Sequence, residues 1–317
     1  MLQTFKSNIR AYANTHIPNK EPNVFIFSTP RSGSTWLMEL IRTQPGFKSC
    51  EEPLNLRNPE VRHQLGLIEW SQIYGSGSYA KMNTYFEGFC NGSRRFMNGN
   101  PLTTHHRFMT NRIVFKVLHG GEDRLNWFAK QFNGSIVLLL RHPLAVSVSR
   151  EIFPRLTTYI SSDFRKHLTD EQLQQSIQII ERGTHLEKGV LSWCLQNMVA
   201  LRHFRKDWVI LTYEQMVLEP APMIQHLANK LELPYLELMM ARMQQPSASS
   251  RKSDRETRAL LDSRMAHKQQ KVIGKWRKKV DEAEGKAAMK ITDTFGLDIY
   301  RWEDDLPSNQ YWVGAKA

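Results

Sequence analysis

A cation, a glycine and several hydroxyls stand close together in the stretch FSTPRSGSTWL, residues 27–37. The guanidinium of Arg31 has the planar shape and the charge that match phosphate or sulfate oxygens, and Gly33 lets a backbone approach a ligand closely. The hydroxyl donors are Ser32, Ser34 and Thr35. These residue types predict a site for an anion, although a plain strand–turn–helix with glycine at the turn would show the same pattern.

A second combination of this kind occurs in LLLRHPLAVSVSREIF, residues 138–153. Arg141 ends an apolar run, Pro143 suits the first position of a helix, and Ser149 follows Arg141 by eight residues, about two helical turns. An arginine at a strand end and a hydroxyl from the next helix can hold an anion between them. Taken alone, a core strand with a capping arginine is the simpler explanation.

Both segments need strands and helices that hold them at one edge of a sheet. A strand that turns directly into a helix points the free N–H groups of that helix at one small volume, where phosphate or sulfate binds. Apolar strands alternate with helical patterns, which predicts an α/β fold with a central parallel β-sheet between layers of helices. The predicted strands are residues 23–28, 112–118, 134–141 and 207–213, and the predicted helices are 35–43, 169–183, 187–205 and 221–232.

The chain is predicted to form a single domain over residues 1–317, with a peripheral N-terminal arm at 1–22 and a loop-rich segment at 53–110. A basic loop is expected at 246–279. Between Arg251 and Lys279 stand eleven Lys and Arg against three acidic residues, in a chain of net charge +12. Such a local excess favours an anionic ligand, although a solvated charged helix or loop would show it too.

Several classes of protein are disfavoured by composition. No apolar run approaches the roughly 18 residues of a membrane span, and the N-terminus has no hydrophobic core of the signal-peptide kind, so a cytoplasmic location is expected. Cys50, Cys90 and Cys194 show neither metal-ligand spacing nor a disulfide framework and are expected to be reduced. The basic segment contains Trp276 as its one aromatic ring for stacking, which disfavours a nucleic-acid-binding module.

The pair TPRSGSTWL and, about a hundred residues later, RHPLAVSVSR resembles the sulfotransferases that use 3′-phosphoadenosine 5′-phosphosulfate (PAPS). The second motif is closest in form to the carbohydrate sulfotransferases, of a soluble, bacterial style. CEEPLNL at 50–56 resembles a Glu-Pro element of those enzymes, and LTYEQMVLEP at 211–220 resembles another family segment. The resemblance extends from about residue 23 to residue 302. It implies one sulfotransferase domain with a three-layer, P-loop-like α/β fold that needs no metal.

The resemblance also implies roles for residues at matching positions. The first motif would wrap the 5′-phosphosulfate, the second would hold the 3′-phosphate, and the basic loop would close over the nucleotide, while segment 53–110 would face the acceptor. The implied nucleotide ligands are Arg31, Ser32, Gly33, Ser34, Thr35, Trp36, Arg141, Ser149, Tyr213 and Gly274. The usual Arg-Lys-Gly of the late loop is absent, and Lys271 or Lys268 is expected to replace it.

Sulfuryl transfer requires in-line placement of the reactants and stabilisation of the charge that builds on the leaving phosphate. Arg31 and the helix N-terminus are placed to stabilise that charge. Glu52 aligns with the Glu-Pro element and is our first choice for the general base, with His119 as the second. Lys116 could reach the bridging oxygen, although a surface lysine at a strand end would look the same.

The predicted function is transfer of a sulfuryl group from PAPS to a hydroxyl acceptor, a carbohydrate or glycoside. A non-sugar alcohol, phenol or amine is the alternative acceptor. A nucleotide kinase of the phosphate-loop kind is a more distant alternative, because its Gly-x-x-x-x-Gly-Lys-Ser/Thr element is missing. The oligomeric state stays open.

Overall fold

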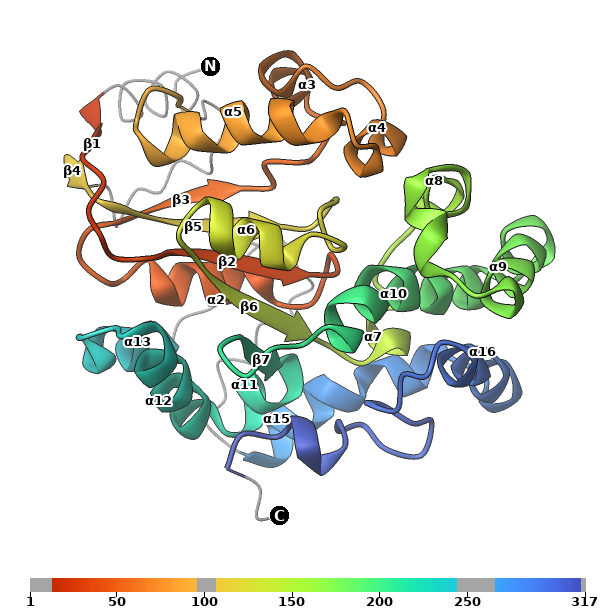
Figure 1. Cartoon of the computed structure of the whole chain (residues 1–317). Helices are drawn as coiled ribbons and strands as arrows, with labels where there is room; N and C mark the ends of the chain where they lie inside the picture. The colour runs from red at the N-terminus through yellow and green to blue at the C-terminus, as the bar shows by residue number, and fades with distance from the viewer. Residues whose placement is uncertain (1–12, 96–106, 244–265, 315–317) are drawn as a thin grey trace, which may run out of the picture.

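The computed structural model describes residues 13–95, 107–243 and 266–314. Its core is a five-stranded parallel sheet with the strand order β3-β5-β2-β6-β7, and β1 pairs with β4 in a small separate sheet (Figure 1). The strands are β1 Thr15–His16, β2 Asn23–Ser28, β3 Phe47–Glu51, β4 Met109–Thr110, β5 Arg112–Val117, β6 Gly134–Leu140 and β7 Val209–Thr212.

Helices connect the strands and cover both faces of the sheet. Before β6 they are α2 Ser34–Ile41, α3 Pro59–Leu65, α4 Trp70–Tyr74, α5 Ser78–Cys90 and α6 Leu125–Gln131. After β6 they are α7 Pro143–Ser147, α8 Leu156–Ser161, α9 Asp170–Arg182, α10 His185–Arg202, α11 Tyr213–Leu218, α12 Pro220–Leu231, α13 Leu236–Met243, α15 Ala266–Ile273 and α16 Glu282–Thr294. Short 3₁₀ helices are η1 Asp163–His167, η3 Gly274–Lys279 and η4 Asn309–Tyr311.

The central strands are buried on both faces because their side chains alternate between two apolar layers. Phe25 and Phe27 of β2 join the cluster formed with α5 and α6, where Phe25 stacks on Phe115 with 4.5 Å between ring centroids. Val24 and Ile26 face the opposite layer, which α2, α12 and α13 cover. Figure 1 shows these helices on the two sides of the sheet.

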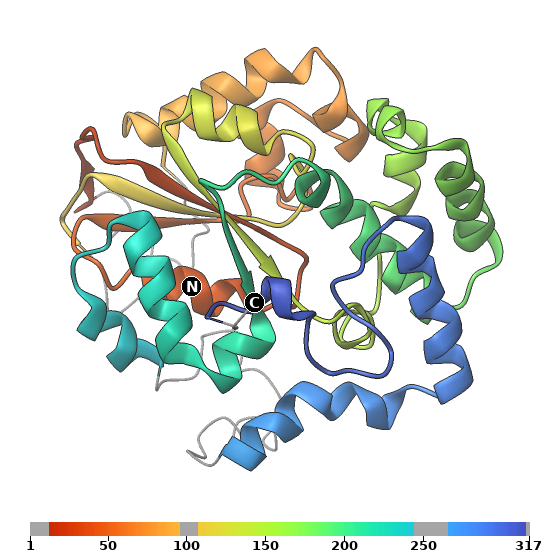
Figure 2. The same cartoon turned by 60° about the horizontal axis from the view of Figure 1, so that its bottom comes forward.

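A third apolar cluster joins α7, α10 and α16 beyond the carboxyl ends of the strands. Figure 2 shows α15 and α16, the blue part of the chain, along the outside of the molecule. In the sheet, Phe27 of β2 pairs with Val117 of β5 and with Leu138 of β6. The three central strands therefore end at one edge, called here the carboxyl edge, and loops at such an edge commonly form ligand sites.

The four predicted strands are confirmed, as is the parallel α/β architecture. The helix predicted from Thr169 begins with the expected capping box between Thr169 and Gln172. Strand β3 of the central sheet was not predicted, nor were the two-residue strands β1 and β4; β3 is an edge strand whose sequence FKSCE has only two apolar residues.

The prediction of a loop-rich segment at 53–110 is wrong for its described part, which contains α3, α4 and α5. Helix α3 has recognisable ends, since the Asn58 side chain accepts a hydrogen bond from the Glu60 N–H, Pro59 stands at the first turn and Gly66 closes the helix with φ 68°. Residues 96–106 lie outside the described residues.

The prediction of a loop at 246–279 is wrong for residues 266–279, which form α15 and η3. Basic residues are good helix formers, and Val272, Ile273 and Trp276 supply the buried side of this segment. The remainder of the basic run lies outside the described residues. Among the residues described, no helix is long and apolar enough to cross a membrane.

Candidate active site

The turn between β2 and α2 is compact and has an unusual backbone. Arg31 has φ 76° and Gly33 has φ 89°, both in the left-handed region. The hydroxyls of Thr29 and Ser32 are buried and 2.6 Å apart. A Cβ atom at position 33 would lie 2.7 Å from the ring of Tyr213, so glycine is needed here both for its conformation and for the close approach.

The end of β6 meets this turn through Arg141. Its Nη1 donates a hydrogen bond to the Arg31 carbonyl at 2.7 Å, and its guanidinium lies 4.0 Å from the centroid of the Tyr213 ring. The Trp193 Nε1–H donates to the Arg141 carbonyl at 2.9 Å. Residues distant in the sequence, Arg31, Gly33, Arg141 and Tyr213, thus form one group at the carboxyl edge, which we call the nucleotide end.

Buried polar groups hold the nucleotide end from behind. The Glu214 carboxylate accepts hydrogen bonds from the His142 backbone N–H at 3.0 Å and from the Tyr300 hydroxyl at 2.7 Å. The His142 ring stacks on Trp276 at 4.5 Å. Burial lowers the pKa of His142 to about 3, so this imidazole is neutral at physiological pH. The sequence analysis did not single out His142 or Glu214, although each directly follows a predicted ligand.

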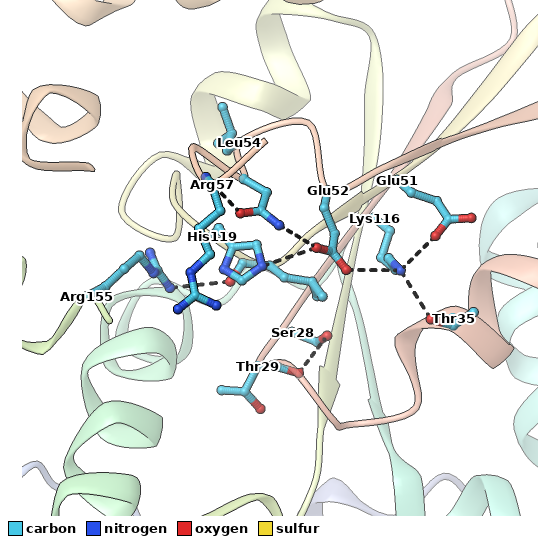
Figure 3. Close-up of polar contacts among 12 residues, drawn as sticks. Ser28, Thr29, Thr35, Glu51, Glu52, Leu54, Arg57, Lys116, His119 and Arg155 are labelled. Carbon is cyan, nitrogen blue, oxygen red and sulfur yellow. Dashed lines mark hydrogen bonds and ion pairs between the residues drawn. The ribbon is translucent and has the colours of Figure 1, made fainter. Parts of the chain in front are cut away.

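The second group at the carboxyl edge is organised by Lys116 of β5, which is buried. Its Nζ lies 3.1 Å from Glu51 Oε2 and 3.4 Å from Glu52 Oε1, and it donates to the Thr35 hydroxyl at 3.1 Å (Figure 3). Burial alone would lower the pKa of Lys116, but the two carboxylates outweigh it and raise that pKa. Lys116 therefore joins the first turn of α2 to the two carboxylates as a fixed cation.

Glu52 stands beside Lys116 in a constrained position. Its φ is 51°, and its backbone N–H donates to the Lys116 carbonyl at 2.8 Å. The side chain of Asn55 donates to Glu52 Oε2 at 3.0 Å. Burial alone would raise the pKa of Glu52, but the hydrogen bond from His119 and the charge of Lys116 lower it to about 2. Glu52 is thus ionised at neutral pH.

His119 follows β5 and faces Glu52. Its Nε2 is 3.3 Å from Glu52 Oε2. Burial lowers the pKa of His119, and the charges of Arg155 and Arg150 lower it further. Glu52 raises this pKa and offsets part of the decrease. The imidazole is therefore neutral at physiological pH. Because a carboxylate only accepts, Nε2 carries the proton that it donates to Glu52, and Nδ1 keeps a free lone pair.

A buried hydrogen-bond network holds the loop that carries His119. Arg155 Nη1 donates to Glu122 Oε1 and to the Tyr74 hydroxyl, each at 2.8 Å, and Arg155 Nη2 donates to the Leu118 carbonyl at 3.3 Å. The hydroxyl of Tyr159 also donates to Glu122. The network joins α4, α8 and the loop after β5. We call this network, with Lys116, Glu52 and His119, the acceptor end.

A small cavity lies between the acceptor end and α10. Apolar side chains form one part of its wall, and Ser28, Glu122, Arg155, Gln196 and Asn197 form the polar part. Gln196 is buried, and its Oε1 has no hydrogen-bond partner within the described part of the chain. The cavity volume is about 10 Å³, so the polar wall offers hydrogen-bond acceptors to one small group such as a hydroxyl.

The other predicted ligands lie around these groups or outside the description. Ser149 is half-buried and donates its hydroxyl to the Val146 carbonyl at 2.8 Å. Trp36 is half-buried, and its Nε1 has no partner among the described residues. Lys271 is exposed on α15, and the side chain of Lys268 lies outside the described residues. A Cβ at Gly274 would lie 2.7 Å from Asp305, so this glycine serves close packing.

The sequence matches the family of the sulfotransferase domain over residues 21–298. The chain belongs to the sulfotransferase family. This membership implies PAPS as the sulfuryl donor of the enzyme. A search of curated proteins finds no match.

Solved sulfotransferase structures are similar to the enzyme at low sequence identity. The sulfotransferase domain of the Synechococcus PCC 7002 olefin synthase has 18% identity and a TM-score of 0.47, over 90% of this chain and 98% of that one. Mouse sulfotransferase SULT7A1 complexed with PAP has 15% identity and a TM-score of 0.45, over 89% and 87%. STF9 from Mycobacterium avium has 13% identity and a TM-score of 0.37, over 83% and 78%. The assignment rests on the family match.

Proposed function

We propose that the enzyme transfers the sulfuryl group of PAPS to a hydroxyl acceptor, with the nucleotide between its two ends. The observation that carries this proposal is the position of Lys116, which contacts Thr35 in the first turn of α2 and Glu52 at 3.1 and 3.4 Å. A donor whose phosphosulfate lies on that turn brings its sulfur next to Lys116 and the Glu52–His119 pair.

The nucleotide end supplies the charges for the donor. Arg31 and the N–H groups that begin α2 face the 5′-phosphosulfate, and Arg141 with Ser149 faces the 3′-phosphate. Among the described residues, the Arg141 guanidinium donates to the Arg31 carbonyl and its Nε has no hydrogen-bond partner, so N–H groups of this side chain are available for phosphate oxygens. Trp36 and Tyr213 offer aromatic surface, and Lys271 offers a charge on the nearby α15.

The transfer forms a bond between the acceptor oxygen and sulfur and breaks the bond between sulfur and the bridging phosphate oxygen. The products are the sulfated acceptor and 3′-phosphoadenosine 5′-phosphate (PAP). Lys116 and Arg31 stabilise the negative charge that the leaving phosphate gains. The proton of the acceptor hydroxyl passes to a base at the acceptor end as the new bond forms.

We assign that proton to His119 Nδ1, with Glu52 as the group that orients the ring. A base works best with a pKa near the working pH, and Glu52, with its pKa of about 2, is a weak one. His119 is neutral, and its Nε2 proton is directed at Glu52. The sequence analysis placed Glu52 first and His119 second as the general base, and this assignment reverses that order.

A carbohydrate or glycoside is the acceptor we propose. It is supported by the form of the second motif and by the polar wall of the cavity, where Gln196 Oε1 and Glu122 can accept hydrogen bonds from hydroxyls. A phenol, an amine or a non-sugar alcohol is the alternative acceptor.

Ligand-induced thermal stabilisation tests the donor. PAP should raise the melting temperature of the enzyme more than ATP with Mg²⁺ does, because only PAP carries the 3′-phosphate that Arg141 binds. A preference for ATP with Mg²⁺ would contradict the proposal and favour the kinase alternative. Transfer from radiolabelled PAPS to a panel of glycosides, phenols and amines then identifies the acceptor class.

A further inference from the structure

Three arginines gather at the acceptor end from two segments of the chain. Arg57 follows β3, Arg150 lies between α7 and α8, and Arg155 precedes α8. Figure 3 shows Arg57 and Arg155 directed to the same side of the site as His119. The positive charges of Arg155 and Arg150 both act on His119, and those of Arg155 and Arg57 act on Arg150.

Of the three arginines, Arg155 alone has a carboxylate partner among the residues that the structure describes. Arg155 pairs with Glu122 at 2.8 Å. Arg150 is half-buried; it donates to the Ser192 hydroxyl at 3.5 Å and lies 4.8 Å from the Phe153 ring centroid. Arg57 is exposed. In the described ranges, neither Arg57 nor Arg150 forms an ion pair with an acidic side chain.

This arrangement has an electrostatic cost in the absence of a ligand. Burial, with the charges of Arg155 and Arg57, lowers the pKa of Arg150 to about 10, which still leaves it protonated at neutral pH. Partly buried like charges without a counter-ion are unfavourable, and an anion bound among them removes that cost. The other cation here, Lys116, is already paired with Glu51 and Glu52.

The contacts of Arg150 place it beside the cavity rather than at the first-motif turn. Arg150 donates to the hydroxyl of Ser192, and Gln196, one helical turn further along α10, donates to that same hydroxyl at 2.8 Å. Gln196 and Arg155 both line the cavity. Arg155 thus lies in the wall of the cavity, which Leu118 and Gly120 on either side of His119 also line, and Arg150 is joined to that wall through Ser192.

We propose that the acceptor carries an anionic group, a carboxylate, sulfate or phosphate, which Arg57 and Arg150 bind while its hydroxyl lies at His119. The proposal rests on the proposed sulfuryl transfer and adds the class of acceptor. Guanidinium groups suit this role because they bind planar and tetrahedral oxyanions through paired hydrogen bonds.

Matched acceptors that differ in one charged group test the proposal. The probes are the glucuronide and the glucoside of para-nitrophenol, para-hydroxybenzoate and its amide, and beta-hydroxybutyrate and its amide. Release of PAP from PAPS gives kcat/KM for each member, and calorimetry on the PAP-saturated enzyme gives its affinity. The charged member should be preferred by about tenfold or more in at least one pair.

Substitution then shows whether the arginines cause that preference. Arg57→Gln and Arg150→Gln should each reduce the preference for the charged member by about tenfold and leave the affinity for PAP within about twofold. Arg205→Gln is the matched control, because Arg205 is an exposed arginine before β7, away from the carboxyl edge. The control should retain the full preference.

Each other outcome has a definite meaning. Equal kcat/KM and equal binding of charged and neutral members in every pair overturn the proposal, as does a preference that survives both substitutions. Loss of PAP affinity in Arg150→Gln assigns this arginine to the donor and likewise overturns it. A protein that neither binds PAP nor consumes PAPS would contradict the proposed function itself. The PAP titration distinguishes this outcome from a failure of the acceptor proposal.

Discussion

The two ends of the site are built in different ways. At the nucleotide end, Gly33, Tyr213 and Arg141 meet through a close backbone approach and a stacked guanidinium, and the buried polar groups of His142, Glu214 and Tyr300 hold them. At the acceptor end, charged groups share partners: Lys116 contacts two carboxylates, and three donors converge on Glu122 Oε1.

The difference suggests that shape fixes the nucleotide end and charge balance fixes the acceptor end. Removal of one group at the acceptor end leaves its buried partners without compensation, so effects there should be large and should reach turnover. Removal of one group at the nucleotide end should weaken binding of the donor and leave the chemical step unchanged.

The largest expected effect is on the base. His119→Ala should lower kcat roughly 10²–10⁴-fold, because the neutral imidazole no longer takes the proton of the acceptor. Glu52→Gln should also lower kcat, since it removes the charge that orients the ring. Affinity for PAP, measured by calorimetry, should stay unchanged in both. A strong loss in Glu52→Gln with near-normal turnover in His119→Ala would return the base role to Glu52.

The second largest effect on turnover is expected from substitution of Lys116. Lys116→Met should lower kcat about 10²–10³-fold, because the leaving phosphate loses its nearest fixed charge. Turnover with PAPS at saturating acceptor measures it. Lys48→Met is the control, because Lys48 is a half-buried lysine of β3 near the opposite end of the sheet, opposite Ile113. Similar losses in both variants would indicate a general effect on folding.

A smaller effect, confined to binding, is expected at the nucleotide end. Arg141→Ala should weaken PAP binding by about 1.5–3 kcal/mol, because a charged partner of the 3′-phosphate is lost. Once the enzyme is saturated with PAPS, kcat should be close to normal. Calorimetry with PAP and with adenosine 5′-phosphate checks the assignment, and equal losses for the two ligands would place Arg141 away from the 3′-phosphate.

The smallest effect on turnover is expected from His142, which acts on stability through pH. Its pKa lies at about 3 in the folded protein, below the ordinary 6.5, so the unfolded chain binds the proton first. The contribution of His142 to the free energy of unfolding is fully present above pH 6.5. It declines as the pH falls toward 3, by about 2 kcal/mol between pH 7 and pH 5. Urea unfolding of His142→Asn at these two values should show a smaller decline, and an unchanged decline would exclude His142 as its source.

The carboxylate of Glu52 at the acceptor end should respond to acid at a lower pH than His142 at the nucleotide end. The pKa of Glu52 is lowered from 4.5 to about 2, so its stabilising effect is present above pH 4.5 and is lost only as the pH falls toward 2. Mild acid therefore leaves the Glu52–Lys116 pair intact, and the His142→Asn variant separates the effect of His142 from that of His119, whose pKa burial also lowers.

The sequence predicted the nucleotide end better than the acceptor end, and the reason is physical. Strand, turn and helix signals are local, so FSTPRSGSTWL and the end of β6 could each be recognised as a strand followed by a helix, and the family resemblance implied that both serve one nucleotide. Tyr213 came from the family resemblance, and its contact with Gly33 confirms that these segments meet. The four predicted strands could be recognised from their apolar runs alone.

The acceptor end depends on pairings that no local pattern contains. Tyr74, Glu122, Arg155 and Tyr159 come from α4, from the loop before α6 and from α8 and its start. Nothing in their spacing indicates that they share one network. The helices α3 to α5 could have been predicted from the cap at Asn58–Pro59 and from Gly66, but β3 has too few apolar residues to be recognised.

Two side chains of the site are attached to backbone in the left-handed region, Arg31 at φ 76° and Glu52 at φ 51°. Residues other than glycine adopt this region at a cost on the order of 1 kcal/mol or more. Thermostability and fitness can therefore oppose each other at these two positions. A selection for heat resistance that ignores activity would enrich glycine at these positions. The selected protein would be more stable and would lack two side chains of the site.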